Sequence, residues 1–198
     1  MTFKVATATN AKSVSWKNRT YTWEELAKKF TSAKVTEETY REFMAASKAE
    51  QGAIKDVGAF MGGELFGSRR NKNNVGERSL LALDIDYGEA DFPERFFAAI
   101  NCACIIHGTH KHNPKAGVLR YRVIIPLSEP VDGEQYEAIA RKVAEITGID
   151  LYDRTTFQPE RCMFFPSVSR DVDYDYTDYS QLCETPLDVN EYLNMYED

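Results

Sequence analysis

The run Leu80-Leu81-Ala82-Leu83-Asp84-Ile85-Asp86-Tyr87-Gly88 places two acids in an otherwise apolar stretch. The apolar residues predict a β-strand, and side chains two residues apart on a strand point to the same side. The Cα atoms of Asp84 and Asp86 would then lie about 7 Å apart on one face. Two carboxylates this close repel each other, and each costs free energy to desolvate. We therefore expect a positive group between them.

The order of elements around this strand predicts the fold. It is followed by a helix over 91–100, strands over 102–108 and 120–127, an amphipathic helix over 132–148 and a short strand over 161–167. This β-α-β-β-α-β order indicates an α+β fold with a ferredoxin-like, RRM-like core. The first and third strands of such a core are neighbours. We therefore expect Asp84 and Asp86 to lie beside Arg120 and Arg122.

The segments on either side of this core suggest a domain division. Helical patterns occupy 20–30, capped by Thr22, and 35–52, capped by Thr36, and the glycine-rich, basic stretch 55–79 predicts a hairpin or loop. We predict a catalytic domain over 1–170, with its core at about 55–170 and an N-terminal helical and β-hairpin extension over 1–54. The acidic, tyrosine-rich segment 171–198 is predicted to pack on the domain or to serve as a linker.

Charge is distributed unevenly along the 198 residues. The net charge is −7, but residues 171–198 contain nine acids and no Lys or Arg. No acid lies between Glu94 and Glu129, and that interval holds all three histidines and five Lys or Arg residues. A local basic surface for nucleic acid is therefore compatible with an acidic chain. The alternative is a chance fluctuation among solvated surface charges.

The apolar pattern and the cysteines bear on location. No apolar run approaches the roughly 20 residues that span a bilayer, and the N-terminus lacks the apolar stretch of a signal peptide. We expect a cytoplasmic protein. Cys102 and Cys104 alternate in a predicted buried strand and are expected to be core thiols rather than part of a disulfide framework.

The acid pair has the chemistry of a metal site. Mg²⁺ and Mn²⁺ prefer oxygen ligands, and two carboxylates plus a third can hold two ions. Asp150 and Asp153, which follow the second helix, are both candidates for the third carboxylate. The alternative for the pair itself is a strand edge facing solvent.

The second cluster is His107, His110 and His112, in the run 105-IIHGTHKHNP-114. One interpretation is that an imidazole meets a phosphate, with Lys111, Arg120 and Arg122 as further anion ligands. The alternatives are a polar turn, or a zinc site that includes Cys102 or Cys104.

These segments, together with 148-GIDLYDRTTFQPERCMFFPS-167, resemble the catalytic core of the archaeo-eukaryotic primase superfamily, and most of all the primase-polymerase domains of phages and mobile elements. The resemblance covers roughly residues 55–170. The superfamily's acid pair corresponds to Asp84 and Asp86, and its later single acid corresponds to Asp153. Its small-x-His segment corresponds to His110-Lys111-His112, with His112 as the expected functional histidine. His110 stands where a small residue is usual, so it is the alternative contact for the nucleotide.

The resemblance implies a template-directed nucleotidyl transferase, a DNA primase, a DNA polymerase or both. Asp84, Asp86 and Asp153 would be the catalytic and metal-binding residues for two Mg²⁺ or Mn²⁺ ions. The nucleotide, an NTP or dNTP, would be bound by His110, Lys111, His112, Arg120, Arg122 and Arg161. Arg69, Arg70 and Lys72 could follow the single-stranded DNA template. The sequence has no phosphate-binding G-x-x-x-x-G-K-[ST] motif, so a helicase partner would be another part of a longer chain or a separate protein in the host bacterium.

Two other functions compete with this interpretation. A replication-initiator nicking endonuclease also uses a ferredoxin-like sheet and a His-x-His metal pair, which 110-HKH-112 resembles. An RNA-recognition-type module shares the topology but needs exposed aromatic residues on its central strands. Here those strands carry Asp84, Asp86, Arg120 and Arg122 instead.

Overall fold

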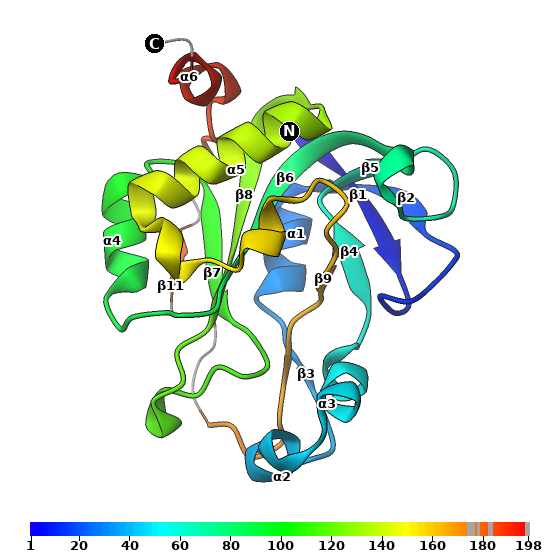
Figure 1. Cartoon of the computed structure of the whole chain (residues 1–198), viewed down its shortest axis with the longest axis vertical. Coiled ribbons are helices and arrows are strands. Elements are labelled where there is room, and N and C mark those ends of the chain that lie inside the picture. The colour runs from blue at the N-terminus through cyan, green and yellow to red at the C-terminus, as the bar shows by residue number, and fades with distance from the viewer. Residues whose placement is uncertain (174–176, 178, 182–183, 197–198) are drawn as a thin grey trace.

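A five-stranded antiparallel sheet lies at the centre of the molecule (Figure 1). The computed structural model describes residues 1–173, 177, 179–181 and 184–196. The strand order is β11-β7-β8-β6-β5. These strands are β5 (Gly63–Leu65), β6 (Val75–Ile85), β7 (Cys104–Gly108), β8 (Tyr121–Val131) and β11 (Tyr179–Gln181).

Helices cover one face of this sheet. They are α4 (Phe92–Ala99), α5 (Gly133–Thr147) and α6 (Val189–Asn194). The odd-numbered residues of β6, Leu81, Leu83 and Ile85, pack into the same core as Phe96 of α4 and Ile139 of α5. The alternation of β6 therefore directs one set of side chains to the helices and the other set to the opposite face.

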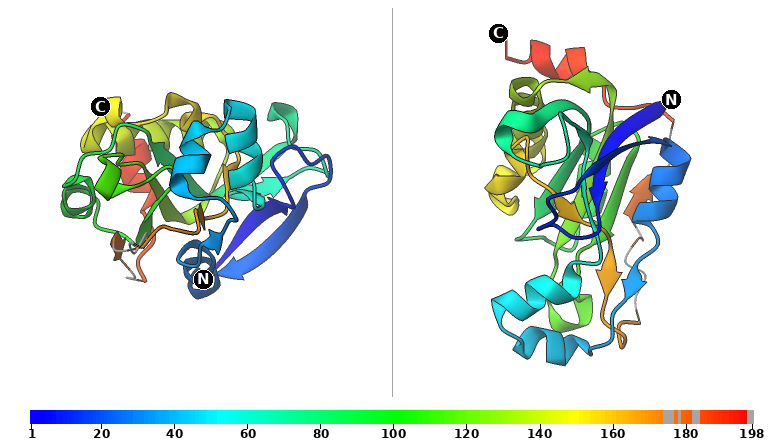
Figure 2. Two further views of the ribbon diagram at one scale, coloured as in Figure 1. Left: turned by 90° about the horizontal axis from the view of Figure 1, so that it is seen from below. Right: turned by 90° about the vertical axis from the view of Figure 1, so that its right-hand side faces the viewer.

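The opposite face is covered by a second sheet and a helix (Figure 2). The second sheet has the order β2-β1-β4-β9 and consists of β1 (Thr2–Ala8), β2 (Lys17–Thr22), β4 (Ala59–Met61) and β9 (Met163–Phe164). Leu80 and Ala82 of β6 pack here against Phe60 of β4 and Phe30 of α1 (Trp23–Phe30). Asp84 continues this even-numbered series, so it points toward the second sheet.

The α+β fold class and the β-α-β-β-α order are confirmed, with β6, α4, β7, β8 and α5 as its elements. The central pairing is also as predicted, because Asp84 lies opposite Arg122 and Ile85 opposite Tyr121. The last strand of the pattern, β9, pairs with β4 in the second sheet, and β5 takes the place beside β6. The chain can form the β5–β6 pair locally, because Gly62 and Gly63 let their backbone approach β6 where a Cβ atom would collide.

The predicted single helix over 35–52 is wrong. The structure has a short strand β3 (Lys34–Val35), paired in parallel with β10 (Ser167–Val168), and then two helices, α2 (Tyr40–Ala45) and α3 (Lys48–Lys55). Thr39 and Ser47, not Thr36, cap these helices through capping boxes with Glu42 and Glu50. Two start signals eight residues apart divide the segment, because the second can be satisfied only if Ala46 leaves the helix. Figure 1 shows both helices at the opposite end of the molecule from α6.

Residues beyond 170 contribute to the main core. Leu187, Val189 and Tyr192 are buried there, and β11 pairs with β7. The expected core thiols Cys102 and Cys104 are buried, while Cys183 lies outside the described residues. The domain boundary at 170 remains a prediction. In the described part of the chain, the structure contains no helix that is both apolar and long enough to cross a bilayer.

Candidate active site

A row of polar side chains crosses the central sheet at the ends of three strands. His107 of β7 lies opposite Arg122 of β8, which lies opposite Asp84 of β6. All three point to the second-sheet side, where Leu80, Ile105 and Ile124 of the same strands form the core. Near the strand ends the apolar cover gives way to a cavity of about 290 Å³.

Arg122 neutralises Asp84 directly. Its Nε and Nη2 atoms donate to the two carboxylate oxygens of Asp84 at 2.6 and 3.0 Å, and its Nη1 donates to the carbonyl of Phe164 at 2.6 Å. Only 8% of the Arg122 side chain and 15% of the Asp84 side chain are exposed. The expected positive partner of Asp84 is therefore a buried, bidentate arginine.

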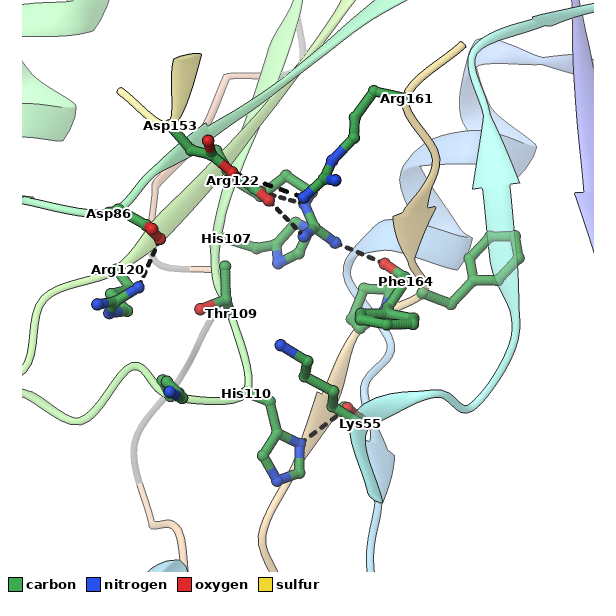
Figure 3. Close-up of a pocket in the computed structure, with 15 residues that line it drawn as sticks. Lys55, Asp86, His107, Thr109, His110, Arg120, Arg122, Asp153, Arg161 and Phe164 are labelled. Carbon is green, nitrogen blue, oxygen red and sulfur yellow. Dashed lines mark hydrogen bonds and ion pairs between the residues drawn. The ribbon is translucent and has the colours of Figure 1, made fainter. Parts of the chain in front are cut away.

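Asp86 has a more open environment. Its carboxylate accepts a hydrogen bond from Nη1 of Arg120 at 2.5 Å, with 40% of the Asp86 side chain exposed. Figure 3 shows this pair at the cavity beside Thr109. Each acid of the pair thus has its own arginine from β8 or the residue before it.

Backbone hydrogen bonds bring Asp153 to the acid pair. The amide of Asp153 donates to the carbonyl of Asp84 at 2.9 Å, and Ile85 forms an isolated antiparallel bridge with Tyr152. The Asp153 carboxylate accepts from the amide and hydroxyl of Thr155, and it lies 3.6 Å from Nη2 of Arg161. Asp84, Asp86 and Asp153 therefore line one cavity. Figure 3 labels Asp86 and Asp153 there. Asp150, the other candidate, is fully solvent-exposed and does not line this cavity in the described structure.

The histidine segment divides between the cavity and the interior. His107 and His110 line the cavity, and His112 does not belong to its described lining. The ring of His112 is buried against Tyr121, its Nδ1 accepts the amide of Arg120 at 3.1 Å, and it packs where a Cβ atom on residue 108 would lie. The residues of this segment that line the cavity are therefore His107, Thr109, His110 and Lys111.

A polar network fixes His110. Its Nδ1 lies 2.8 Å from Oγ of Ser167, and its Nε2 lies 3.1 Å from Oε1 of Glu38. Burial raises the pKa of Glu38, but hydrogen bonds from Thr36, from its own backbone and from Ser169 and His110 outweigh this and lower it. Burial lowers the pKa of His110. Segment 36–38 and β10 thus hold this imidazole at the cavity wall.

Burial keeps the other two histidines neutral. It lowers the pKa of His107 to about 4, with a further contribution from the Arg122 charge, and it lowers the pKa of His112 to about 4. Nδ1 of His107 lies 2.8 Å from the carbonyl of Gly108, so it donates this hydrogen bond. These rings are polar contacts rather than fixed positive charges at neutral pH.

The cavity also contains a cation that the sequence did not indicate. Lys55, at the end of α3, lines it together with Lys111, whose carbonyl accepts a hydrogen bond from Tyr40. Burial, reinforced by the nearby Lys111 and Arg122 charges, lowers the pKa of Lys55. Five cationic side chains therefore surround the three carboxylates: Lys55, Lys111, Arg120, Arg122 and Arg161.

The predicted template residues lie elsewhere. Arg69 and Lys72 are exposed in the loop before β6 and do not line the cavity in the described structure. Nη1 of Arg70 donates to the carbonyl of Glu160 at 2.7 Å, and its guanidinium stacks on Trp16. Arg70 thus contributes to the fold of this loop.

The competing interpretations find little support in this geometry. Among the described residues, no group of three or more His, Cys, Asp or Glu side chains is placed to hold a metal ion, and this includes the three carboxylates of the cavity. His110 lines the cavity and His112 does not, so these two rings do not form a His-x-His pair there. The sheet face that an RNA-recognition module would leave open is covered here by α1 and the second sheet.

Comparisons with known proteins identify the family. The family model described as "VapE N-terminal domain" matches residues 1–198, so the chain belongs to this family. No curated protein sequence matches it.

Two solved structures are similar in outline. The AEP domain of the cyanophage S-2L primase-polymerase has a TM-score of 0.44 and 10% identity, over 98% of this chain and 88% of that one. The polymerase domain of Mycobacterium tuberculosis ligase D, in complex with DNA, has a TM-score of 0.44 and 13% identity, over 98% of this chain and 81% of that one.

Proposed function

We propose that this chain is a template-directed nucleotidyl transferase, a DNA primase, a DNA polymerase or both. The observation that supports this most is the convergence of Asp84, Asp86 and Asp153 on one cavity that also holds five cations. Carboxylates suit divalent metals, and Lys and Arg suit phosphates, so one cavity offers both parts of a metal–nucleotide complex. The motif resemblance to the archaeo-eukaryotic primases points to the same chemistry.

In the chemistry of their oxygen atoms the three carboxylates fit Mg²⁺ or Mn²⁺, but in this structure Asp84 and Asp86 are bonded to arginines and the three do not form a ready ligand set. All three belong to neighbouring backbone segments and present oxygen ligands, which these ions prefer. Both oxygens of Asp84 are bonded to Arg122, so Asp84 can bind an ion only when Arg122 turns to another partner. When bound, two such ions supply Lewis-acid activation of the attacking hydroxyl and neutralise charge on the leaving group.

The remaining side chains position the nucleotide. Arg120, Arg122, Lys111, Lys55 and Arg161 would bind the triphosphate, and His110 would contact it from the wall formed by β10. The 3′-hydroxyl oxygen forms a bond to the α-phosphorus, the bond from that phosphorus to the bridging oxygen breaks, pyrophosphate leaves, and the hydroxyl proton is lost to water. The protein contributes orientation and electrostatic stabilisation, with no covalent intermediate.

The wider setting is also a proposal. We place the activity in the cytoplasm of a bacterial host, in the replication of a phage or mobile element. A single-stranded DNA template and NTPs or dNTPs would be its substrates. A helicase, in the same polypeptide or separate, would be its partner.

The test is incorporation of labelled nucleotides on a single-stranded template with Mn²⁺ or Mg²⁺, with and without a primer. We expect products from the wild-type chain and none from Asp86→Asn, whose fold should be intact because Asp86 is half-exposed. Products from the unprimed reaction would indicate priming. Equal incorporation by wild type and Asp86→Asn would contradict the proposal.

A further inference from the structure

A basic groove leads away from the active-site cavity along strand β2. It consists of two adjoining cavities of about 540 and 600 Å³ that share Tyr21, Lys29, Val57 and Phe165. Phe165 and Pro166 also line the active-site cavity, so these two residues form the wall between it and the groove. We call this the β2 groove. Its described cationic lining consists of Lys17, Arg19, Lys28, Lys29 and Lys34.

The alternation of β2 builds one side of this groove. The strand reads Lys-Asn-Arg-Thr-Tyr-Thr, and Lys17, Arg19 and Tyr21 share one face. On the other face, Asn18 is fixed by hydrogen bonds with the backbone of Leu65 at 3.0 Å. Since β2 is the edge of its sheet, no further strand pairs along its outer side, and Lys17 and Arg19 are exposed.

The groove cations have no acidic partners. All five are exposed, and in the described part of the chain none of them forms an ion pair. The acid in the lining is Glu25, and its carboxylate is already bonded to the amide of Thr22 in the capping box of α1. Exposed cations elsewhere, such as Lys4 and Lys115, do have carboxylate partners. The positive charge of the groove is therefore available to an external anion.

Two aromatic rings lie among these cations. Tyr21 and Phe165 are half-buried and line both parts of the groove. Phe165 is held by Phe60, with ring centroids 5.2 Å apart, and by Phe30 at 6.2 Å. Nζ of Lys29 lies 5.2 Å from the centroid of the Tyr21 ring. Positioned aromatic faces between cations suit a polymer in which flat bases alternate with phosphates.

We propose that the β2 groove binds single-stranded nucleic acid. Phosphates would contact Lys17, Arg19 and the lysines of α1, bases would stack on Tyr21 and Phe165, and the strand would enter the active-site cavity over Phe165 and Pro166. That last step rests on the proposed nucleotidyl transfer, whereas the binding itself does not. An acidic polypeptide would use the cations but would leave the aromatic faces without a function.

The test is fluorescence anisotropy with a labelled oligothymidylate of roughly 20 nucleotides and an oligouridylate of equal length, over a range of salt concentrations. In Lys17→Glu/Arg19→Glu we expect the Kd to rise at least about tenfold, and the slope of log K against log salt to fall by about 1.4 in magnitude, as for two lost phosphate contacts. Tyr21→Ala should weaken binding about tenfold while Tyr21→Phe keeps it, because the ring is what stacks. The two probes compare DNA with RNA.

The matched control is Lys12→Glu/Lys48→Glu. These lysines are exposed, lie outside the groove lining and give the same change in net charge. We expect wild-type affinity from this variant. Thermal melting checks that the β2 variants fold, and Lys28→Glu/Lys29→Glu, on α1, repeats the test without altering the strand.

The inference would be overturned by wild-type affinity in folded groove variants, by an equal loss in the control, or by polyglutamate competing as well as the oligonucleotide. If only Arg69→Glu/Lys72→Glu lost binding, the nucleic acid would bind at the loop before β6, and this result would also overturn the inference. Groove-dependent binding without any incorporation by the wild type would count against the proposed function alone.

Discussion

Asp84 and Asp86 lie two residues apart on one strand but in different surroundings. Asp84 and Arg122 are a largely buried bidentate pair, whereas Asp86 and Arg120 are a partly exposed one. Loss of one member of a buried pair leaves the other charge desolvated without compensation. Removal of the Asp84 carboxylate would therefore leave the buried Arg122 guanidinium without its counter-charge.

We therefore expect the two substitutions to differ in stability but not in activity. Asp84→Asn should lower the free energy of unfolding by roughly 3 kcal/mol, and Asp86→Asn by less than about 1 kcal/mol, because exposed pairs contribute little. Both should abolish nucleotide incorporation. Urea denaturation measures the first effect, and primer extension under conditions where both variants are folded measures the second. Equal stability of the two variants would show that the Arg122 pair is unimportant for folding.

The buried histidines make stability depend on pH. Burial lowers the pKa of His107 and of His112 to about 4, whereas a histidine in the unfolded chain titrates near 6.5. The unfolded chain therefore takes up protons first as the pH falls. Each neutral ring therefore contributes to the free energy of unfolding fully above about pH 6.5, and this contribution is lost progressively toward pH 4. By pH 5 the loss in the free energy of unfolding is about 2 kcal/mol per histidine.

Urea denaturation between pH 7.5 and 5 measures this loss, because carboxyl groups scarcely titrate in that interval. His112→Gln, which can still accept the Arg120 amide, should remove about 2 kcal/mol of the loss by pH 5, while His107 and His110, whose pKa values burial also lowers, keep their shares. An unchanged dependence in this variant would assign the effect to other groups.

At the scale of elements, the loop that carries His110 is held by segments far away in the sequence. Glu38 precedes α2 and Ser167 begins β10, and both contact the His110 ring. Glu38 also accepts hydrogen bonds from Thr36 and Ser169, so one carboxylate joins β3, β10 and the histidine loop.

We expect Glu38→Ala to raise the nucleotide KM at least about tenfold with a smaller change in kcat, because the imidazole loses its support at the cavity wall. Glu38→Gln keeps an acceptor oxygen and should recover most of the affinity. Steady-state kinetics of the three chains gives the comparison. If KM is unchanged in Glu38→Ala, His110 does not contact the nucleotide.

The pairing of β6 with β8 could be predicted from the sequence because it follows from alternation and strand order. Asp84 and Arg122 are neighbours for that reason alone. The position of His112 could not be predicted from the sequence, because the turn after Gly108 directs its ring to Tyr121. Lys55 gave no signal either, since α3 reaches the cavity only through tertiary packing. Strand β2 was not predicted because its residues do not alternate between apolar and polar side chains.

At the scale of the whole molecule, the segment after residue 170 completes the sheet and the core. Strand β11 pairs with β7, and Leu187 and Val189 are each 1% exposed in the main core. A chain that ends at 170 would leave the edge of β7 open to other strands and would remove these side chains.

Deletion of 171–198 should therefore cost roughly 5 kcal/mol or more, from the apolar burial of Leu187, Val189 and Tyr192. This loss is comparable with the whole stability of many domains, so we expect an unfolded or aggregated product. Light scattering and thermal melting would show it. Asp171→Asn/Asp173→Asn removes charge from the same segment and should melt like the wild type. A truncated chain that melts normally would support a domain boundary at 170.

Finally, three carboxylates and five cations share a cavity of about 290 Å³ and neutralise one another in part. If an anion binds Arg122, Asp84 loses its counter-charge. If a metal ion binds Asp84, Arg122 loses its own. Binding of the anion and the metal ion together leaves neither side chain without a counter-charge. Their binding should therefore be cooperative, and each should raise the affinity for the other by the same factor, on the order of tenfold. Calorimetric titration of the metal ion with no anion and with saturating anion measures this factor. A factor of one would mean that the ion pairs Asp84–Arg122 and Asp86–Arg120 do not exchange partners.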